Sequence, residues 1–455
     1  MGILITSGEQ SRIINMQLMY VKYNLGLAVL SPALALYLAK RYINGKSRPG
    51  WRERWGHIPT NIATDLRPTV WVHGASAGEV VAAIPVMREL KLQLPGWRIL
   101  LSVITPAGFE MAKKQADGVA DDVFYLPFDF PWVVHSVVSK IHPRLFVTLE
   151  SELWPNLLHA LRAAGARTAL VNGRKSVRSF HRAKQYAAGL YRWMIGNLDL
   201  MLMQSAADAE RMTQLGEPVP TAQKCIVTGN SKLDQALPPL EAGTSQELRA
   251  ALHLPSAGPV WVVGSTRSSQ EEALVIRVYA KLAAQRCDIA MVLAPRQLER
   301  APHIVKQLND AGIRANLKSQ LTQDSDTCPV LVLDTMGELA KVYAIADFAF
   351  VGNTFAPVVQ GGGQNILQPV ALGKPVIIGP LYATVKNEAA LLAPGGAVKV
   401  VETEEQLYLE ALTLMNDPDE CRLKGEAGRR VLEAQRGVAR RCAALLVNLT
   451  ESPVQ

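Results

Sequence analysis

Cysteine is scarce in this chain, and its few copies stand far apart. The five cysteines are odd in number and never form a C-x-x-C pair: Cys225, Cys287, Cys328, Cys421 and Cys442. This pattern excludes a disulfide framework and a zinc knuckle, because both need paired or closely spaced thiols. Reduced thiols in a cytosolic setting are therefore predicted.

Internal repeats, low-complexity tracts and recognisable nucleic-acid-binding modules are also absent from the 455 residues. These absences leave ordinary globular domains as the expected class of structure. A hydrophobic content of 49% in a chain of this length suffices for two packed cores. The 48 Lys and Arg outnumber the 40 Asp and Glu, and the net charge of +8 favours phospholipid head groups, phosphorylated lipids or nucleic acid as partners. Charge alone does not choose among them. Without a module, we predict no nucleic-acid partner.

Charge is nearly missing between Met19 and Leu38, where Lys22 is the one charged residue. A helix of about 20 residues is ~30 Å long, which matches the hydrocarbon thickness of a bilayer. The Lys- and Arg-rich segment 40–54 that follows predicts that the rest of the chain stays on the cytoplasmic side of the inner membrane. A signal peptide fits poorly, because its charges precede the apolar run. Lys22 and Pro32 keep two alternatives open: a helix lying in the membrane interface, or one packed against the body.

Short runs rich in Val, Ile and Leu alternate with amphipathic segments along the rest of the chain. Before a Pro- and Gly-rich break, strands are predicted at 69–73, 99–104, 123–126, 145–149, 168–171, 200–203 and 226–228. After the break, they are predicted at 260–263, 289–293, 330–333, 348–351, 376–378 and 398–401. This rhythm predicts an α/β protein with two doubly wound, Rossmann-like domains facing a cleft.

The predicted domain order follows from these runs and the break. It is a membrane anchor at 1–45, a first domain at 46–234, a linker at 235–258, and a second domain with a helical tail at 259–455. In doubly wound sheets, ligands lie beyond the carboxyl ends of the strands. The loops that follow the strands are therefore expected to hold the chemistry.

Two such loops carry recognisable chemistry. In segment 357–369, three glycines precede a short helix, which predicts a phosphate site; the alternative is a tight glycine turn before an ordinary helix. In His73–Glu79, two glycines and Ser76 bend the chain before Glu79 begins a helix that Pro85 is expected to kink. A carboxylate at a helix start is stabilised by the helix dipole. We expect Glu79 to stay ionised as a general base, the alternative being an ordinary helix-start glutamate.

Short motifs are spread along nearly the whole chain: Trp51–Gly56, His73–Glu79, Thr105–Gly108, Tyr125–Asp129, Glu150–Asn156, Asn172–Arg174, Gly229–Lys232, Ala294–Arg296, Asp334–Leu339 and the glycine-rich segment 357–369. Each motif alone is weakly specific. In this order, they resemble the family of 3-deoxy-D-manno-octulosonic acid (Kdo) transferases, which act on the lipid A precursor of Gram-negative envelopes.

The resemblance implies an inverting glycosyltransferase of the GT-B architecture that works without a metal or another cofactor. Its donor is expected to be CMP-Kdo, and its acceptor the lipid A precursor, a lipid-linked glucosamine disaccharide. Glu79 matches the family's catalytic base, and Glu150 and Lys232 match positions that stabilise the transition state. Ser76 and Arg174 fall on the acceptor side. From the residues alone, the alternative for Glu150 is a strand-end ion pair, and the alternative for Lys232 is a solvated loop lysine.

The same resemblance assigns the donor site to the second domain. The matching positions are Pro295, Arg296, Met336, Gly337, Glu338, Asn365, Ile366, Leu367 and Gln368. Arginine suits a phosphate because its planar fork donates two hydrogen bonds at once. Without the resemblance, Arg296 is more often a surface arginine and Gly337–Glu338 an ordinary helix start.

The chain departs from the family pattern at the glycine-rich segment. Where the family reads Gly-Gly-His-Asn-Pro-Leu-Glu-Pro, residues 362–369 read Gly-Gly-Gln-Asn-Ile-Leu-Gln-Pro. A glutamate at 368 accepts hydrogen bonds from both ribose hydroxyls, whereas Gln368 accepts with one end, and charge-assisted bonds are about twice as strong as neutral ones. Gln364 keeps hydrogen-bonding ability, so that change is milder. Weaker donor affinity or a different donor is expected.

Segment 174–193 mixes cations with aromatic residues. Such a mixture suits an acidic lipid surface, with Phe180 or Trp193 dipping into the interface. The alternative is a helix with a solvated basic face.

Two other function classes remain open because of Gln368. One is a glycosyltransferase of the same architecture with a different activated sugar, and the other is a membrane-attached binding or scaffold protein without turnover. A binding module has no chemical need for first-domain carboxylates. The joint retention of Glu79, Glu150, Lys232 and Arg296 therefore argues against the scaffold.

Overall fold

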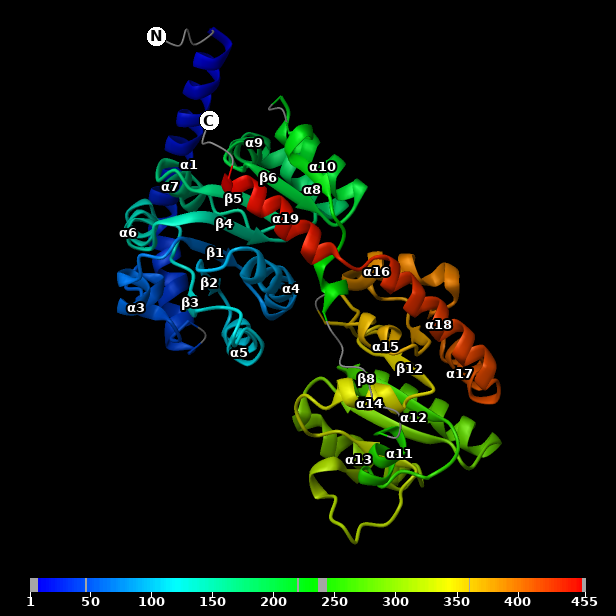
Figure 1. Ribbon diagram of the computed structural model, residues 1–455. Helices are drawn as coiled ribbons and strands as arrows, with labels where there is room; N and C mark the ends of the chain where they lie inside the picture. Colours follow the sequence, from blue (N-terminus) through cyan, green and yellow to red (C-terminus); the bar gives the residue numbers. More distant parts are fainter. Residues whose placement is uncertain (1–6, 46, 219–220, 236–243, 360, 452–455) are drawn as a thin grey trace. The chain divides into compact units, whose positions relative to one another are not determined.

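The computed structural model describes residues 7–45, 47–218, 221–235, 244–359 and 361–451 (Figure 1). These residues form two compact units. The first unit comprises Met1–Gln235 and Arg436–Gln455, and the second comprises Ala236–Gln435.

The first unit is built on a parallel seven-stranded sheet in the order β3-β2-β1-β4-β5-β6-β7. Its strands are β1 (Thr69–His73), β2 (Arg98–Val103), β3 (Asp122–Tyr125), β4 (Pro143–Leu149), β5 (Arg167–Gly173), β6 (Leu200–Met203) and β7 (Cys225–Val227). Helices α4 (Ala77–Gln93), α5 (Pro106–Gln115) and α19 (Val438–Glu451) share one core with the sheet. The other core includes α3 (Thr60–Thr64), α6 (Pro131–Ile141), α7 (Pro155–Ala163), α8 (Val177–Tyr186), α9 (Ala188–Gly196) and α10 (Ala206–Gly216). A sheet buried on both faces needs near-continuous apolar strands, which the sequence supplies.

The second unit has its own parallel seven-stranded sheet, in the order β10-β11-β9-β8-β12-β13-β14. Its strands are β8 (Val260–Thr266), β9 (Ala290–Pro295), β10 (Ala315–Leu317), β11 (Val330–Val332), β12 (Phe348–Val351), β13 (Val376–Ile378) and β14 (Val398–Val400). Its helices are α11 (Thr244–Ala251), α12 (Ser269–Gln285), α13 (Ala301–Asp310), α14 (Leu339–Ile345), α15 (Leu367–Ala371), α16 (Lys386–Leu392), α17 (Glu404–Asn416) and α18 (Pro418–Ala434). The α/β prediction, with two doubly wound sheets, is confirmed.

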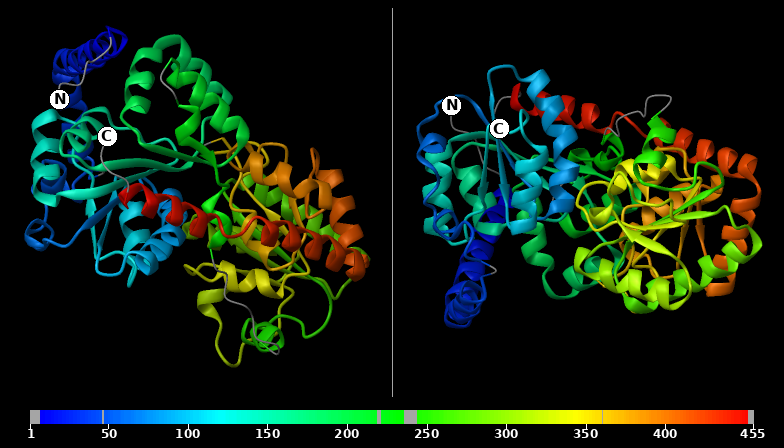
Figure 2. Two further views of the ribbon diagram at one scale, coloured as in Figure 1. Left: turned by 45° about the horizontal axis from the view of Figure 1, so that its top comes forward. Right: turned by 90° about the horizontal axis from the view of Figure 1, so that it is seen from below.

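Helix α19 corrects the predicted assignment of the whole tail to the second domain. It lies beside α4 in the first unit (Figures 1 and 2), where Val438, Cys442 and Leu446 are fully buried. The carboxylate of Asp234 accepts the backbone N–H of Gly437 at 2.7 Å and so fixes the approach to this helix. The predicted linker needs a correction too, because residues 244–251 form α11; residues 236–243 lie outside the described residues.

Helix α1 (Ser7–Ile43) is long and apolar enough between Leu18 and Ile43 to cross a membrane, judged by length and composition. One face of it contacts the first unit. The Tyr20 ring stacks on His159 at 4.0 Å, the Tyr23 hydroxyl donates to Asp129 at 3.1 Å, and Asn24 pairs with Asn156 at 2.9 Å. The opposite face exposes large apolar side chains: Leu18, Val21, Leu25, Val29, Leu30, Leu36 and Tyr37.

Candidate functional site

Loops at the carboxyl edge of the first sheet bring the predicted catalytic residues into one cluster. Strands β1, β4 and β5 are neighbours and run parallel, so the residues that follow them emerge at the same edge. Glu79 follows β1 on the first turn of α4, Glu150 follows β4, and Arg174 follows β5. Lys232 reaches the cluster from the short helix that follows β7.

Glu79 folds back onto the loop that precedes it. Its carboxylate accepts the backbone N–H of Ala75 at 2.7 Å and the Ser76 hydroxyl at 3.2 Å. Burial, with the negative charges of Glu152 and Glu150, raises the pKa of Glu79 to about 7. We expected this carboxyl to stay ionised; desolvation and the neighbouring carboxylates oppose ionisation, so a protonated fraction is expected at neutral pH.

Glu150 and Lys232 form an ion pair, with 2.7 Å between Oε1 and Nζ. Nη1 of Arg174 lies 4.0 Å from the other carboxylate oxygen. Glu150 has a left-handed backbone, with φ at 54°, which is uncommon for a residue other than glycine and typical of functional loops. Glu150 therefore forms the strand-end ion pair that was its alternative. Its partner is Lys232, so this lysine is not simply a solvated loop residue.

A buried serine fixes the loop that carries Lys232. The Ser231 hydroxyl donates to the carbonyl of Ala82 in α4 at 2.8 Å, and its N–H donates to the side chain of Asn172 at 3.0 Å. Ser231 and Asn172 fall within the sequence motifs, but no role was predicted for either residue. Sequence reasoning also missed Glu152, whose own pKa is raised by burial and by Glu150.

The predicted donor residues lie in loops at the carboxyl edge of the second sheet. Arg296 follows β9, Met336–Glu338 follow β11, and Asn365–Gln368 lead from β12 into α15. These strands are parallel, so the three segments share one edge. Arg296 is exposed, with its N–H bonded to the carbonyl of Thr266 at 2.9 Å.

The glycines of segment 357–369 serve the fold of the second unit. A Cβ on Gly362 would lie 2.0 Å from the carbonyl oxygen of Leu381, and one on Gly363 would lie 2.8 Å from the hydroxyl of Thr384. The backbone N–H of Gly363 donates to the carbonyl of Asn353 at 2.7 Å, so this N–H is used within the second unit. Close packing within the second unit is thus sufficient to require glycine at these two positions, and the phosphate site stays a prediction. Gln360 lies outside the described residues.

Arg267, on the loop after β8, is a candidate that sequence reasoning missed. Its Nε is buried and has no hydrogen-bond partner among the described residues. Burial and the neighbouring guanidinium of Arg296 lower the pKa of Arg267. Two neighbouring arginines at the carboxyl ends of the paired strands β8 and β9 form a candidate anion-binding position, since like charges gain from a shared anionic partner. The only sequence signal was a cation directly after a buried strand.

Buried Glu271 holds the neighbouring loop in place. Its carboxylate accepts three consecutive backbone N–H groups, from Asn353 and Thr354 at 2.8 Å and from Phe355 at 3.1 Å. These bonds fix the start of the loop between β12 and α15, which leads to Gln368. Glu271 is therefore a structural residue of the candidate donor site.

Comparisons with known proteins identify the family of this chain and its fold. The family model described as 3-deoxy-D-manno-octulosonic-acid transferase (kdotransferase) matches residues 49–235. The chain is 31% identical to the 3-deoxy-D-manno-octulosonic acid transferase of Haemophilus influenzae over 87% of its own length and 90% of the relative. It is also 31% identical to the protein of that name from Bordetella pertussis, over 92% and 96%. A glycosyltransferase structure from Rickettsia africae matches 86% of this chain and 100% of that chain, with a TM-score of 0.55 and 12% identity, so the fold is GT-B-like.

Proposed function

The chain belongs to the Kdo transferase family of lipopolysaccharide biosynthesis, and from this premise we propose that it moves Kdo from CMP-Kdo to the lipid A precursor with inversion and without a metal. The observation that carries the proposal is the joint placement of Glu79, Glu150 and Lys232 at one sheet edge. This edge is where ligands bind in doubly wound sheets.

The chemistry assigned to the cluster is a single displacement. The acceptor hydroxyl gives its proton to Glu79, and its oxygen bonds to the anomeric carbon of Kdo. The bond from that carbon to the phosphate oxygen breaks, and CMP leaves with the electron pair from the opposite face. A base with a pKa of about 7 combines a large unprotonated fraction with useful basicity at neutral pH.

Two kinds of charge serve the transition state. Positive charge develops on the sugar ring, and the carboxylate of Glu150 counters it. The Lys232 ammonium faces the carboxylate of Kdo or the departing phosphate. In the second unit, Arg267 and Arg296 bind the phosphate of CMP, while Met336–Glu338 and Asn365–Gln368 contact the nucleoside.

A transfer assay tests the proposed function. Purified full-length protein with detergent-dispersed lipid A precursor and CMP-Kdo should release CMP and yield a Kdo-bearing lipid. Stronger thermal protection by UDP or GDP than by CMP would favour a different activated sugar. Binding of CMP-Kdo without any release of CMP would instead favour the scaffold alternative.

Restoring the family carboxylate at position 368 should tighten donor binding. We expect Gln368→Glu to lower the Kd of CMP by roughly 3- to 10-fold, because a carboxylate accepts both ribose hydroxyls through charge-assisted bonds. Isothermal titration measures the change. Asn387→Asp adds the same charge on the first turn of α16, outside the proposed donor residues, as a control. An unchanged Kd in the first variant, or an equal gain in the second, would reject the ribose contact.

We place the protein at the cytoplasmic face of the inner membrane, with α1 lying in the interface. The polar contacts of Tyr23 and Asn24 with the first unit support this over a span, since they fall inside the apolar stretch 18–43. If α1 spanned the membrane, Tyr23 and Asn24 would lie in the hydrocarbon layer. Their partners Asp129 and Asn156 belong to the folded first unit, which cannot enter that layer. The exposed apolar face of α1 supplies the lipid contact.

Membrane binding should therefore depend on the exposed face of α1. Changing Leu25, Val29 and Leu36 together to Ser should release the protein from vesicles of phosphatidylethanolamine and phosphatidylglycerol, since each side chain contributes roughly 1.5–3 kcal/mol. Vesicle flotation measures this release, and Leu92→Ser in α4, where Leu92 is 75% exposed, is the control. Wild-type protein should also leave membranes at alkaline pH; resistance to that extraction would indicate a span instead.

A further inference from the structure

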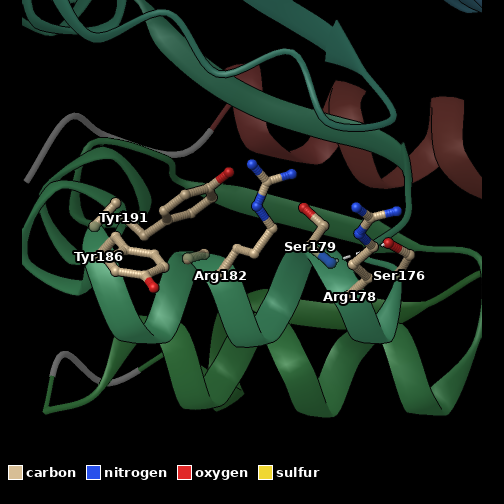
Figure 3. A pocket seen from close by; sticks show the side chains of 8 residues that line it. Ser176, Arg178, Ser179, Arg182, Tyr186 and Tyr191 are labelled. Atoms are coloured by element: carbon tan, nitrogen blue, oxygen red, sulfur yellow. Dashed lines mark hydrogen bonds between the residues drawn. The ribbon is translucent and has the colours of Figure 1, made fainter.

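A cavity of about 580 Å³ opens on the first unit beside α8 and α9 (Figure 3). Its polar and aromatic lining residues are Ser176, Arg178, Ser179, Arg182, Tyr186 and Tyr191. Arg178 and Arg182 stand one helical turn apart on α8. Figure 3 shows both guanidinium groups and the hydroxyl of Ser179 rising to the same side of this helix. The cavity thus presents two cations and a hydroxyl together.

The segment that forms this cavity carries many basic residues and no acidic residue to balance them. Between Glu152 and Asp199, the chain has eight Lys and Arg residues and no Asp or Glu. Neither Arg178 nor Arg182 forms an ion pair or hydrogen bond with any residue in the described part of the chain. Structural arginines normally hold a carboxylate or a carbonyl, so this pair is available for an external anion.

A buried lysine supports the cavity from behind. Lys175 is 3% exposed, and its Nζ donates to the hydroxyl oxygen of Tyr191 at 2.7 Å. Because the ammonium has only donors, the Tyr191 hydroxyl accepts that bond and keeps its own hydrogen for another acceptor. The Lys175 backbone N–H is bound by the buried Asp208 at 2.7 Å, which fixes the lysine in this position. A positively charged wall with a free hydroxyl donor results.

We propose that this cavity binds a phosphomonoester carried on a sugar of the acceptor glycolipid. Arg178 and Arg182 bind the phosphate oxygens, Ser179 and Tyr191 donate hydroxyl hydrogen bonds, and the ring of Tyr186 contacts the sugar. The proposal rests on the proposed function, because it places the acceptor of that reaction.

The position of the cavity fits a substrate that is both lipid-linked and close to the catalytic cluster. Arg174, beside Glu150, is two residues from Ser176 of the cavity, a span of at most about 7 Å of chain. On the other side, Trp193 of α9 packs against Tyr20 of α1, with ring centroids 5.9 Å apart. A phosphorylated sugar with acyl chains can therefore reach the cluster and the lipid interface at once.

Equilibrium binding in the absence of CMP-Kdo tests this site separately from transfer. The probes are detergent-dispersed bisphosphorylated lipid A precursor, the same lipid with its phosphates removed, and phosphatidylglycerol vesicles. Arg178→Ala and Arg182→Ala should each weaken binding of the bisphosphorylated lipid by about 10-fold, the usual loss of one charged hydrogen-bonding partner. Lys184→Ala removes a cation from the same helix outside the cavity and should change binding less than 2-fold.

The arms of this experiment distinguish the phosphorylated sugar from a phospholipid head group. Binding of the dephosphorylated lipid should be weak and equal in all four proteins. The proposal is overturned if Lys184→Ala weakens binding as much as Arg182→Ala. It is also overturned if both arginine variants lose the vesicles and the bisphosphorylated lipid to the same extent, which identifies a general acidic-surface contact. The experiment measures binding only, so its result does not depend on whether the protein transfers Kdo. Failure of this proposal and failure of the proposed function are therefore distinguishable.

Discussion

Glu79→Gln is expected to lower kcat by roughly 10²–10⁴-fold, the usual loss when general-base assistance is removed. The amide keeps the size of the side chain: its oxygen can accept the N–H of Ala75, and its NH2 group can donate to the hydroxyl oxygen of Ser76, so the loop should keep its shape. It cannot take the proton of the acceptor hydroxyl. Because the donor site is assigned to the second unit, the Kd of CMP should change less than 2-fold.

The pH profile gives this prediction a sharper form. With a pKa of about 7, Glu79 is mostly protonated and inactive as a base at pH 6, and mostly ionised at pH 8. The wild-type rate should therefore rise about 10-fold per pH unit below 7 and level off above it. The residual rate of Glu79→Gln should lack this limb. Gln93→Glu, on the same helix, offers a control that must leave the limb intact; a limb that persists in Glu79→Gln would assign the base elsewhere.

The same pKa has a consequence for stability that separates the base from a structural residue. The folded-state pKa of Glu79 lies above its ordinary value of 4.5, so the folded state binds the proton more tightly than the unfolded chain. The associated stability is present below about pH 4.5 and is lost as the pH rises towards 7. Glu79→Gln should then raise Tm at pH 8 and change it little at pH 5, as thermal unfolding at both values can test. A variant that is inactive and also less stable at pH 8 would indicate collapse of the loop.

The strands were predictable because parallel sheets bury both faces. A run such as Thr69–His73 is entirely buried, and its boundaries match the predicted ones. Strand β10, Ala315–Leu317, was missed because it is a three-residue edge strand without a β-branched residue. Helix α19 was predicted as a helix and assigned to the wrong unit. Its amphipathic pattern identifies the buried face but carries no information on which of two cores receives it.

Some features of the candidate site were predictable from where residues stand relative to the strands, and others depend on tertiary contacts. The rule that ligands bind beyond the carboxyl ends of parallel strands predicted that the loop of Glu79 holds chemistry, whereas the role of Glu150 came from the family resemblance. The ion pair between Glu150 and Lys232 joins residues 82 positions apart, and no local pattern encodes such a contact. The raised pKa of Glu79 depends on burial and on Glu152, which are tertiary properties. The close approach of Gly362 to the carbonyl of Leu381 was likewise not predictable, because a glycine in a sequence does not show which part of the protein packs against it.

Lys232→Met should lower kcat by roughly 10²–10³-fold, as the loss of one preorganised charge at a developing anion usually does. The methionine keeps the unbranched stem of lysine and removes the ammonium, so the Ser231 anchor to Ala82 is retained. Lys91→Met removes a lysine from a comparable ion pair of the first unit, with Asp121 at 3.2 Å, and should leave kcat unchanged. Steady-state kinetics with the transfer assay measures all three proteins.

The charge balance of the cluster predicts an additional shift that a structural lysine would not produce. Lys232 neutralises Glu150, whose negative charge already raises the pKa of Glu79. Without the ammonium, that negative charge acts in full, so the ascending limb of the pH profile should move above 7 in Lys232→Met. In a Glu150→Gln background there is no charge to uncover, and the same lysine change should leave the limb where it is. A limb that moves equally in both backgrounds would mean that Lys232 acts on Glu79 directly, and a limb that moves in neither would remove the electrostatic link between the ion pair and the base.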